Sequence, residues 1–244
     1  MSELARLPAW IKRPVPDQAS LAGMKQLFDG LHLHTVCESA QCPNQGVCFM
    51  QGTATFMILG DTCTRNCSFC AVGHGFPIPV DPSEPEHLVD AISKLRLRHV
   101  VITSVTRDDL EDGGASQFAA CVEAIRRRDP LITVEVLIPD FRGKLSSLRR
   151  VLDSSPAVLN HNIETVPRLY PEVRPQARYG RSVELLMMAK AERPDILTKS
   201  GLMLGIGETR EEVILVMEDI REAGWDILTI GQYLRPSPRH HEVV

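Results

Sequence analysis

The sequence predicts an α/β protein whose strands form a partial (β/α)6 barrel. Three observations lead to this fold: six strand-like segments alternate with helix-like segments from residue 53 onward, a cysteine-rich loop follows the first strand, and no G-x-G-x-x-G sequence does. Alternating strands and helices form parallel sheets with right-handed crossovers. An open doubly wound sheet is the alternative. A curved barrel fits the cysteine loop better, because the loop follows a strand and barrel enzymes carry their active sites at the carboxyl ends of the strands.

The strands are short apolar segments rich in β-branched residues, at residues 55–59, 99–103, 133–138, 157–160, 198–204 and 227–230. Apolar residues at helical spacing predict helices between them, at residues 87–97, 117–128, 145–152, 183–192 and 211–222. Thr209 and Glu212 form a capping-box pattern at the start of the last helix. One apolar stripe follows along that helix, made of Val213, Val216, Met217 and Ile220.

The first fifty residues differ in composition from the rest of the chain. They hold many Pro, Gly and polar residues, one helical pattern at residues 21–31, and three cysteines, Cys37, Cys42 and Cys48. We therefore expect two regions. Residues 1–50 are an N-terminal extension with an auxiliary metal-binding motif, and residues 51–244 are the barrel.

The composition is that of an ordinary globular protein, with 24% charged and 43% hydrophobic residues. The net charge of −4 gives no bulk attraction to nucleic acid or to anionic membranes. No apolar run reaches the length of a membrane span, and the N-terminus lacks the apolar core of a secretory signal. We expect a cytoplasmic protein with neither nucleic acid nor a membrane as partner.

Six of the seven cysteines lie between positions 37 and 70. Cytosolic thiols are kept reduced, so this clustering favours metal binding over disulfide bonds. The seventh, Cys121, stands alone in a helical pattern, and we expect it to be a buried small apolar residue.

Cys63, Cys67 and Cys70 form a C-x3-C-x2-C motif directly after the first predicted strand. Four cysteines normally hold an iron–sulfur cluster. Three thiolates from one loop would leave the fourth iron of a four-iron cluster open to a small molecule. A structural zinc site completed by a histidine such as His74 is the alternative.

This motif after a strand resembles the radical S-adenosylmethionine (SAM) superfamily. Phe69 matches the aromatic position that, in the superfamily, shields the cluster and faces the adenine of SAM. The resemblance implies that Cys63, Cys67 and Cys70 hold a [4Fe–4S] cluster whose open iron binds SAM. One electron from the cluster then breaks a carbon–sulfur bond of SAM and releases a 5′-deoxyadenosyl radical.

The second motif, Cys37-x4-Cys42-x5-Cys48, occurs at close range before the first and resembles the lipoyl synthase family. The resemblance continues through residues 103–114, 160–165, 173–179, 201–209 and 231–237, so it covers nearly the whole chain. It implies a second [4Fe–4S] cluster on these three cysteines. That cluster gives up sulfide to C6 and C8 of an octanoyl chain attached to a lysine of a carrier domain, and two SAM molecules are used per lipoyl group.

The resemblance also implies partners. The carriers would be E2 subunits of 2-oxoacid dehydrogenases and the H protein of glycine cleavage, and the low-potential electron donor would be a flavodoxin or a ferredoxin. Two other functions stay open: a radical SAM enzyme whose extra cluster binds substrate, and a non-catalytic module with zinc or an electron-carrying cluster.

Residues after later strands are expected to complete the SAM site. By resemblance, Gly113 and Gly114 meet the methionyl amino end of SAM, since glycine lets backbone approach a ligand closely; a plain turn before a helix is the alternative. Asn162 and Glu164 would bind ribose or amino groups, or else cap a loop. Ile206 is a candidate face for adenine.

Two groups of arginines each have two interpretations. Arg174, with Arg178 and Arg181, would clamp a carboxylate or form a solvated basic face. The run at residues 126–128 ends a helix, where cations suit the helix dipole; a dock for an acidic carrier domain is the alternative.

The C-terminus departs from the family pattern. Lipoyl synthases end in an Arg-Ser-Ser-Tyr motif whose first serine caps the auxiliary cluster, whereas this sequence ends at Val244 without one, and Ser237 matches a strand loop instead. We therefore expect a chain truncated after its sixth strand, lacking the last barrel helix. The first cluster would be viable and the second labile, and an inactive form that still binds clusters is a further alternative.

Overall fold

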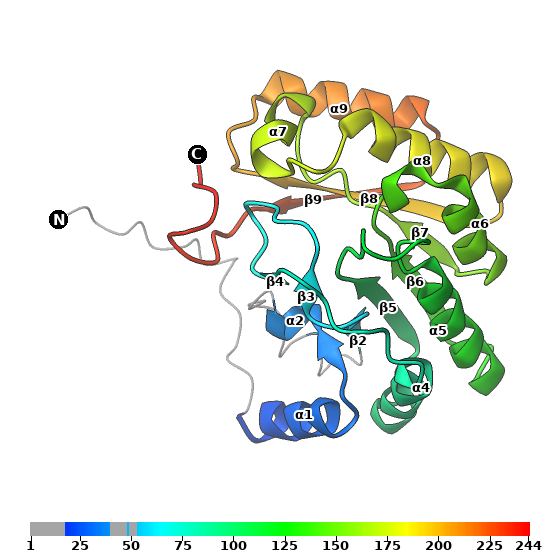
Figure 1. The fold of residues 1–244 in the computed structure, drawn as a ribbon. Helices are drawn as coiled ribbons and strands as arrows, with labels where there is room; N and C mark the ends of the chain where they lie inside the picture. The colour runs from blue at the N-terminus through cyan, green and yellow to red at the C-terminus, as the bar shows by residue number, and fades with distance from the viewer. Residues whose placement is uncertain (1–17, 40–47, 49–52) are drawn as a thin grey trace.

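The computed structural model describes residues 18–39, 48 and 53–244, and it consists of a curved sheet with helices along its outer side (Figure 1). The main sheet has the strand order β1-β2-β5-β6-β7-β8-β9. From β2 to β9 its neighbouring strands run parallel, and β1 alone is antiparallel. Because the order follows the chain, each crossover returns to the next position along the sheet. The predicted partial barrel is confirmed.

The six parallel strands are the six predicted ones, with small shifts of their ends: β2 (Thr53–Ile58), β5 (His99–Ser104), β6 (Thr133–Leu137), β7 (Val158–Asn160), β8 (Leu197–Leu204) and β9 (Ile227–Gln232). The sequence analysis missed three two-residue strands, namely β1 (His34–Thr35), β3 (Thr62–Cys63) and β4 (Gly73–His74). Strands this short carry no alternation of apolar and polar residues, so periodicity cannot find them.

The longer helices are α1 (Gln18–Gly30), α4 (Glu84–Leu95), α5 (Ala115–Arg128), α6 (Leu145–Asp153), α8 (Tyr179–Glu192) and α9 (Arg210–Glu222). Two short ones are α2 (Val36–Ser39) and α7 (Tyr170–Val173), and 3-10 turns lie at Phe141–Gly143 and Pro167–Leu169. All six predicted helices are present. Helix α4 begins three residues earlier than predicted because Pro85 fits its first turn, where no intrahelical N–H bond is needed.

The capping box of α9 is confirmed. Thr209 Oγ1 accepts from the Glu212 N–H at 3.2 Å, and Glu212 Oε2 accepts from the Thr209 N–H at 2.8 Å. The apolar stripe of this helix is narrower than predicted, since Val216 and Ile220 are buried but Met217 is 43% exposed. Met217 follows Val216 directly, so it lies about 100° further round the helix and faces outward.

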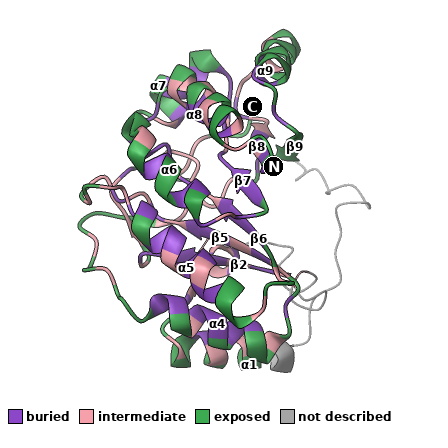
Figure 2. Cartoon of the chain, turned by 90° about the vertical axis from the view of Figure 1, so that its right-hand side faces the viewer, coloured by how far each residue is buried: buried purple, intermediate pink, exposed green. Residues whose placement is uncertain are grey.

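The core lies between the sheet and the inner faces of the helices, as the burial colours of Figure 2 show. Cys121 of α5 is completely buried in it, as predicted. Phe28 of α1 packs edge-to-face on Phe56 of β2, with ring centroids 5.8 Å apart. Together with the pairing of β1 and β2, this contact attaches the described part of residues 1–50 to the barrel.

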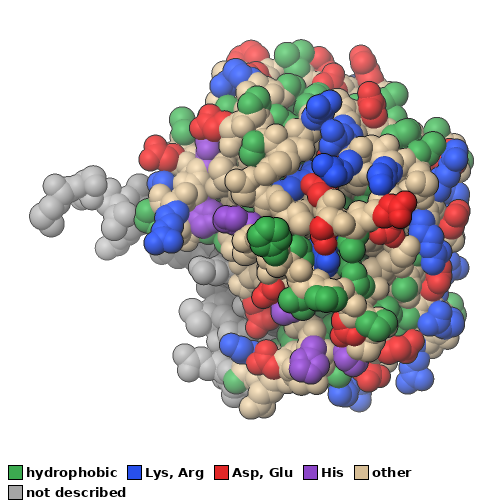
Figure 3. Space-filling model, viewed as in Figure 1, with side chains coloured by type: hydrophobic (Ala, Val, Ile, Leu, Met, Phe, Trp, Pro, Cys, Tyr) green, Lys and Arg blue, Asp and Glu red, His purple; other side chains and the backbone are tan. Residues whose placement is uncertain are grey.

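Acidic and basic side chains are mixed over the face shown in Figure 3. Within the described ranges, no helix combines the length and apolar character that crossing a bilayer requires.

Candidate functional site

The cysteine loop leaves the sheet at the end of β2 through a tight turn. Leu59 and Gly60 both have left-handed backbone, with φ of 69° and 87°. The Leu59 N–H donates to both carboxylate oxygens of buried Glu84, at 3.0 and 3.1 Å. The Leu59 carbonyl accepts from Nη1 of buried Arg107 at 3.3 Å. The start of the loop is therefore fixed from both sides by charged groups inside the protein.

The loop is closed by the small sheet of β3 and β4. Cys63 pairs with His74 in this sheet, and the Gly75 N–H donates to the Cys63 carbonyl at 3.0 Å. The Cys63 sulfur accepts from the Thr106 N–H at 3.3 Å and from the Arg65 N–H at 3.4 Å. Backbone donors thus surround this sulfur, and hydrogen bonds to sulfur are one of the factors that set the potential of an iron–sulfur centre.

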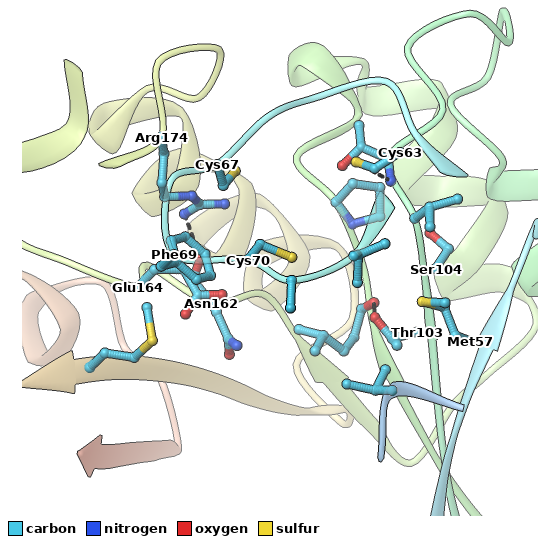
Figure 4. A pocket seen from close by; sticks show the side chains of 18 of the residues that line it. Met57, Cys63, Cys67, Phe69, Cys70, Thr103, Ser104, Asn162, Glu164 and Arg174 are labelled. Atoms are coloured by element: carbon cyan, nitrogen blue, oxygen red, sulfur yellow. Dashed lines mark hydrogen bonds between the residues drawn. The ribbon is translucent and has the colours of Figure 1, made fainter. Parts of the chain in front are cut away.

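Cys63, Cys67, Phe69 and Cys70 line one cavity of about 400 Å³ at the carboxyl ends of the strands. Figure 4 shows Phe69, Asn162, Glu164 and Arg174 on one side of this cavity and Met57, Thr103 and Ser104 on the other, with the cysteines along the loop between them. The structure therefore brings together the cysteine trio and four of the predicted SAM-site residues.

Cys67 and Cys70 are partly shielded from water. Burial raises the pKa of Cys67, against the nearby charge of Arg174, and burial raises the pKa of Cys70 to about 11. Among residues 18–39, 48 and 53–244, no three His, Cys, Asp or Glu side chains meet closely enough to share a single metal ion. A [4Fe–4S] cluster places no such demand, since each thiolate binds a different iron. The donor set and the cavity fit a cluster of this kind.

Asn162 and Glu164 reach the cavity from the loop after β7. Asn162 lies against Gly201 of β8, where a Cβ atom would come within 2.7 Å of its Oδ1. Glu164 has a left-handed backbone with φ of 69°, and its N–H donates to the Gly201 carbonyl at 2.9 Å. Burial raises the pKa of the Glu164 carboxyl, although the charge of Arg174 acts in the opposite direction.

The Arg174 side chain contacts the backbone of the loop that carries Asn162 and Glu164. Its Nη1 donates to the carbonyls of Asn162 and Ile163, at 2.9 and 3.1 Å, and its guanidinium lies 5.4 Å from the centre of the Tyr170 ring. Its Nε is buried without a hydrogen-bond partner among the described residues. Buried donors are rarely left unpaired, so this nitrogen is a candidate contact for a ligand in the cavity.

Gly113, Gly114 and Ile206 are not among the residues that line the cavity. Gly113 and Gly114 have φ of 65° and 90° and lead into α5, and a Cβ on Gly114 would lie 2.3 Å from the Leu59 side chain. Gly114 therefore allows the loop after β5 to pack against the turn at Leu59, whereas a Cβ on Gly113 would lie 3.0 Å from the ring of Phe141. Ile206 is 1% exposed and belongs to the hydrophobic core.

The two arginine groups separate in the structure. Arg181 Nη1 donates to Asp140 at 2.9 Å and Arg178 is exposed, so only Arg174 of the three lines the cavity. In the run at residues 126–128, Arg126 donates to the carbonyl of Ser154 at 3.0 Å. This run precedes β6, which places it at the opposite end of the barrel from the cysteine loop.

For the second cysteine trio, Cys42 lies outside the described residues. Cys37 is buried in α2 and Cys48 is partly exposed. Val36, which directly precedes Cys37, lines the same cavity as the first trio. At least one cysteine of the second motif therefore belongs to a segment that forms the cavity wall.

Sequence reasoning missed several residues around the site. Met57, Ser104 and Met203 line the cavity, and Ser104 Oγ is buried without a partner in the part of the chain that the structure describes. Arg65 and Asp140 form a buried ion pair beneath the cysteine loop. The available signal was positional, because Ser104 ends a strand and Asp140 lies in the loop after the next one.

Comparison with known proteins matches two family models. Residues 57–220 match the radical SAM superfamily, and residues 1–42 match the N-terminal domain of lipoyl synthase of the radical SAM family. Among curated proteins, the lipoyl synthase of Rubrobacter xylanophilus is 58% identical over 96% of this chain and 73% of its own length. That of Syntrophotalea carbinolica is 57% identical over 96% of this chain and 76% of its length.

Solved structures with 12–13% identity share the fold. The hydrogenase maturase HydG matches with a TM-score of 0.62 over 94% of this chain and 52% of its own. Streptococcus suis SuiB, whose structure contains bound S-adenosylmethionine, matches with a TM-score of 0.60 over 77% of this chain and 42% of its own.

Proposed function

Since this chain belongs to the lipoyl synthase family of radical SAM enzymes, we propose that its cavity is where two sulfur atoms are inserted into a protein-bound octanoyl group. The observation that carries the proposal is the convergence of Cys63, Cys67 and Cys70 with polar residues from the opposite wall in one cavity. The cavity lies at the carboxyl ends of the parallel strands, where barrels of this kind carry their chemistry.

We assign Cys63, Cys67 and Cys70 as ligands of the cluster that binds SAM. When bound, that cluster and SAM supply the 5′-deoxyadenosyl radical, which the side chains of a protein cannot generate. Phe69 would cover the cluster, and Arg174, Asn162 and Glu164 would orient SAM by hydrogen bonds and charge. Gly113, Gly114 and Ile206 would act at a distance, by shaping the loops that carry these contacts.

We assign Cys37, Cys42 and Cys48 as ligands of an auxiliary [4Fe–4S] cluster that supplies the sulfur. The position of Val36 on the cavity wall supports this, because it places the start of the second motif beside the first. The apolar side chains of Met57, Leu137 and Met203 also line the cavity and suit an alkyl chain. The octanoyl group would thus lie between a radical source and a sulfur source.

The proposed substrate is an octanoylated lysine on a carrier domain, with E2 subunits of 2-oxoacid dehydrogenases and the glycine cleavage H protein as the carriers. A flavodoxin or ferredoxin of low potential would reduce the cluster. These thiols need a reducing compartment, so we place the reaction in the cytoplasm.

The test uses the anaerobically reconstituted full chain with SAM, a reductant and an octanoyl-lysyl peptide. We expect 5′-deoxyadenosine together with 6- and 8-thiolated products. Cleavage of SAM without any sulfur in the peptide would indicate a radical SAM enzyme whose second cluster only binds substrate. Absence of 5′-deoxyadenosine from protein with a full iron and sulfide content would contradict the proposal altogether.

A further inference from the structure

Arg65 lies between the first two cysteines of the loop, yet its side chain points into the protein. The residue is only 6% exposed. Its Nε and Nη2 donate to the two carboxylate oxygens of Asp108, at 2.7 and 2.9 Å, and Nη2 also donates to Asp140 at 2.7 Å. The first pair of bonds is the bidentate fork that only a guanidinium makes, and it fixes orientation as well as distance.

Asp140 connects this arginine to two further elements. Its Oδ2 accepts from Arg181 of α8 at 2.9 Å, and its Oδ1 accepts from the Arg142 N–H at 3.1 Å. Phe141 and Arg142 follow with left-handed φ of 45° and 53°. Non-glycine residues adopt this backbone at a cost that the surrounding structure must offset, and such residues cluster at functional sites. The turn therefore holds the Asp140 carboxylate in place.

The same loop is tied to the segment that contacts the first cysteine sulfur. Thr64 Oγ1 donates to the Thr106 carbonyl at 2.9 Å and accepts from the Asp108 N–H at 3.0 Å. The Thr106 N–H in turn donates to the Cys63 sulfur at 3.3 Å. A displacement of Arg65 would therefore reach the sulfur through Asp108 and Thr106.

The four charged groups of this network balance one another. Burial alone would lower the pKa of Arg65, but the hydrogen bonds and charges of Asp108 and Asp140 raise it. Burial would raise the pKa of Asp140, but the hydrogen bond and charge of Arg65 lower it far below its usual range. The four groups shielded from solvent, Arg65, Arg181, Asp108 and Asp140, carry two positive and two negative charges. Arg142 also approaches Asp108, at 3.9 Å, but its side chain is 63% exposed and its charge is screened by solvent.

This neutrality matters for a cluster that must be a strong reductant, because nearby net charge shifts the reduction potential of iron–sulfur centres. A positive side chain alone beside Cys63 and Cys67 would raise the potential. A network whose buried charges balance holds the loop in place without raising the reduction potential of the cluster.

We propose that Arg65 is a positioning residue that holds Cys63 and Cys67 at the spacing of the cluster through a charge-balanced network with Asp108, Asp140 and Arg181. The inference rests on the proposed function, since it takes these cysteines as cluster ligands. It assigns a task to the charged residue inside the motif that the cysteines themselves do not perform.

The first test measures how fast an iron chelator destroys the cluster whose electron paramagnetic resonance signal responds to SAM. The reconstituted full chain is compared with Arg65→Gln, Arg65→Lys and the control Arg149→Gln, which breaks an exposed pair with Glu192. We expect cluster loss about 10- to 100-fold faster in Arg65→Gln, the range for residues that support metal ligands. Arg65→Lys falls between, because an ammonium cannot make the bidentate fork. The control matches the unsubstituted chain.

The second test measures the reduction potential of the same cluster, which a residue that only stabilises the fold would not shift in a charge-dependent way. We expect Arg65→Gln to lower the potential, Asp140→Asn to raise it and Arg65→Lys to leave it unchanged. Equal chelator rates for Arg65→Lys and the control would overturn the inference even if Arg65→Gln does not fold. Potentials that move in the same direction in Arg65→Gln and Asp140→Asn would also overturn it. A chain without any SAM-sensitive signal would instead refute the proposed function, and this inference with it.

Discussion

The two walls of the cavity differ in how their charged groups are satisfied. Behind the wall of the cysteine loop, Arg65 is paired with Asp108 and Asp140, and Arg107 is paired with Asp109. On the opposite wall, Arg174 has a buried Nε without a partner among the described residues, although its Nη1 makes three hydrogen bonds. The charged groups of the first wall are thus paired with one another, whereas Arg174 on the second wall keeps an unused charged donor.

This difference indicates that the two walls have different roles. Buried polar groups normally have hydrogen-bond partners. A buried donor without one among the described residues is therefore a candidate contact for a ligand. The wall whose charges are paired therefore positions the cysteines, and the wall with the unused charged donor is suited to hold the small molecule. The following predictions separate these two tasks, starting with the largest effect.

Removal of a cysteine from the first wall should abolish the reaction. In Cys63→Ala the loop keeps only two thiolates, so the cluster that activates SAM is not retained and 5′-deoxyadenosine should be undetectable. Cys121→Ala is the matched control, since Cys121 is buried in the core and lies outside the cavity lining. Radical formation and iron content are measured after anaerobic reconstitution. Full activity in Cys63→Ala would remove the basis for assigning the first wall to the cluster.

His161 directly precedes Asn162 on the second wall, lines the cavity and is 1% exposed. Burial, and then the charge of Arg174, lower its pKa from 6.5 to about 4. Its Nδ1 lies 2.8 Å from the Ile138 carbonyl and its Nε2 lies 2.9 Å from Ser182 Oγ, contacts that the neutral ring satisfies. Because the folded state binds its proton less readily than the unfolded state, stability is lost as pH falls from about 6.5 to about 4.

The expected loss is about 3 kcal/mol for a shift of this size. It is measured as the free energy of unfolding of the metal-free protein at pH 8 and at pH 4. His161→Gln cannot titrate there, so its stability should fall less over the same interval. An identical pH dependence in the two proteins would show that His161 is protonated without cost, and that burial does not hold this side chain of the second wall neutral.

On the second wall, Arg174→Gln should weaken SAM binding by about 10- to 100-fold, because hydrogen bonds to charged groups are worth about 1.5–3 kcal/mol. The cluster itself should stay, since the first wall is unchanged. Arg178→Gln is the control, as Arg178 is exposed and does not line the cavity. SAM affinity is read from the titration of the cluster's resonance signal. Loss of the cluster in Arg174→Gln would mean that this wall also positions the cysteines.

Some features of the fold and of these two walls are predictable from the sequence. The six parallel strands follow from short segments rich in apolar and β-branched residues, and the helices between them follow from apolar residues at helical spacing. The cysteine loop after β2 and its neighbours Phe69, Asn162, Glu164 and Arg174 follow from motif and position, and the structure places all of them on one cavity. Their roles toward a ligand remain predictions.

The network of the first wall does not follow from the sequence. Arg65, Asp108 and Asp140 belong to three loops that are far apart in the sequence, and only the pairing of β2, β5 and β6 as neighbouring parallel strands brings them together. The position of Gly114 is likewise not predictable from the sequence, which suggested a contact with SAM. Its missing side chain leaves room for Leu59 rather than directly for a ligand, and a sequence cannot tell which neighbour a glycine accommodates.

The smallest effect concerns Gly201, which gives Asn162 its place on the second wall. A Cβ in Gly201→Ala would lie 2.7 Å from Asn162 Oδ1 and 3.0 Å from its Cγ, so the amide must rotate away. Because a side chain can move more easily than backbone, the cost in unfolding free energy should be about 1 kcal/mol, at the low end for overpacking. SAM affinity should fall several-fold.

Gly231→Ala on the neighbouring strand β9 is the matched control. No heavy atom of the described residues lies within 4 Å of a Cβ there, so alanine should leave stability unchanged or raise it slightly by reducing the freedom of the unfolded chain. Thermal unfolding and the SAM titration are run on both variants. If Gly201→Ala binds SAM as Gly231→Ala does, Asn162 contributes no ligand contact, and the open bonding capacity of the second wall reduces to Arg174 and Glu164.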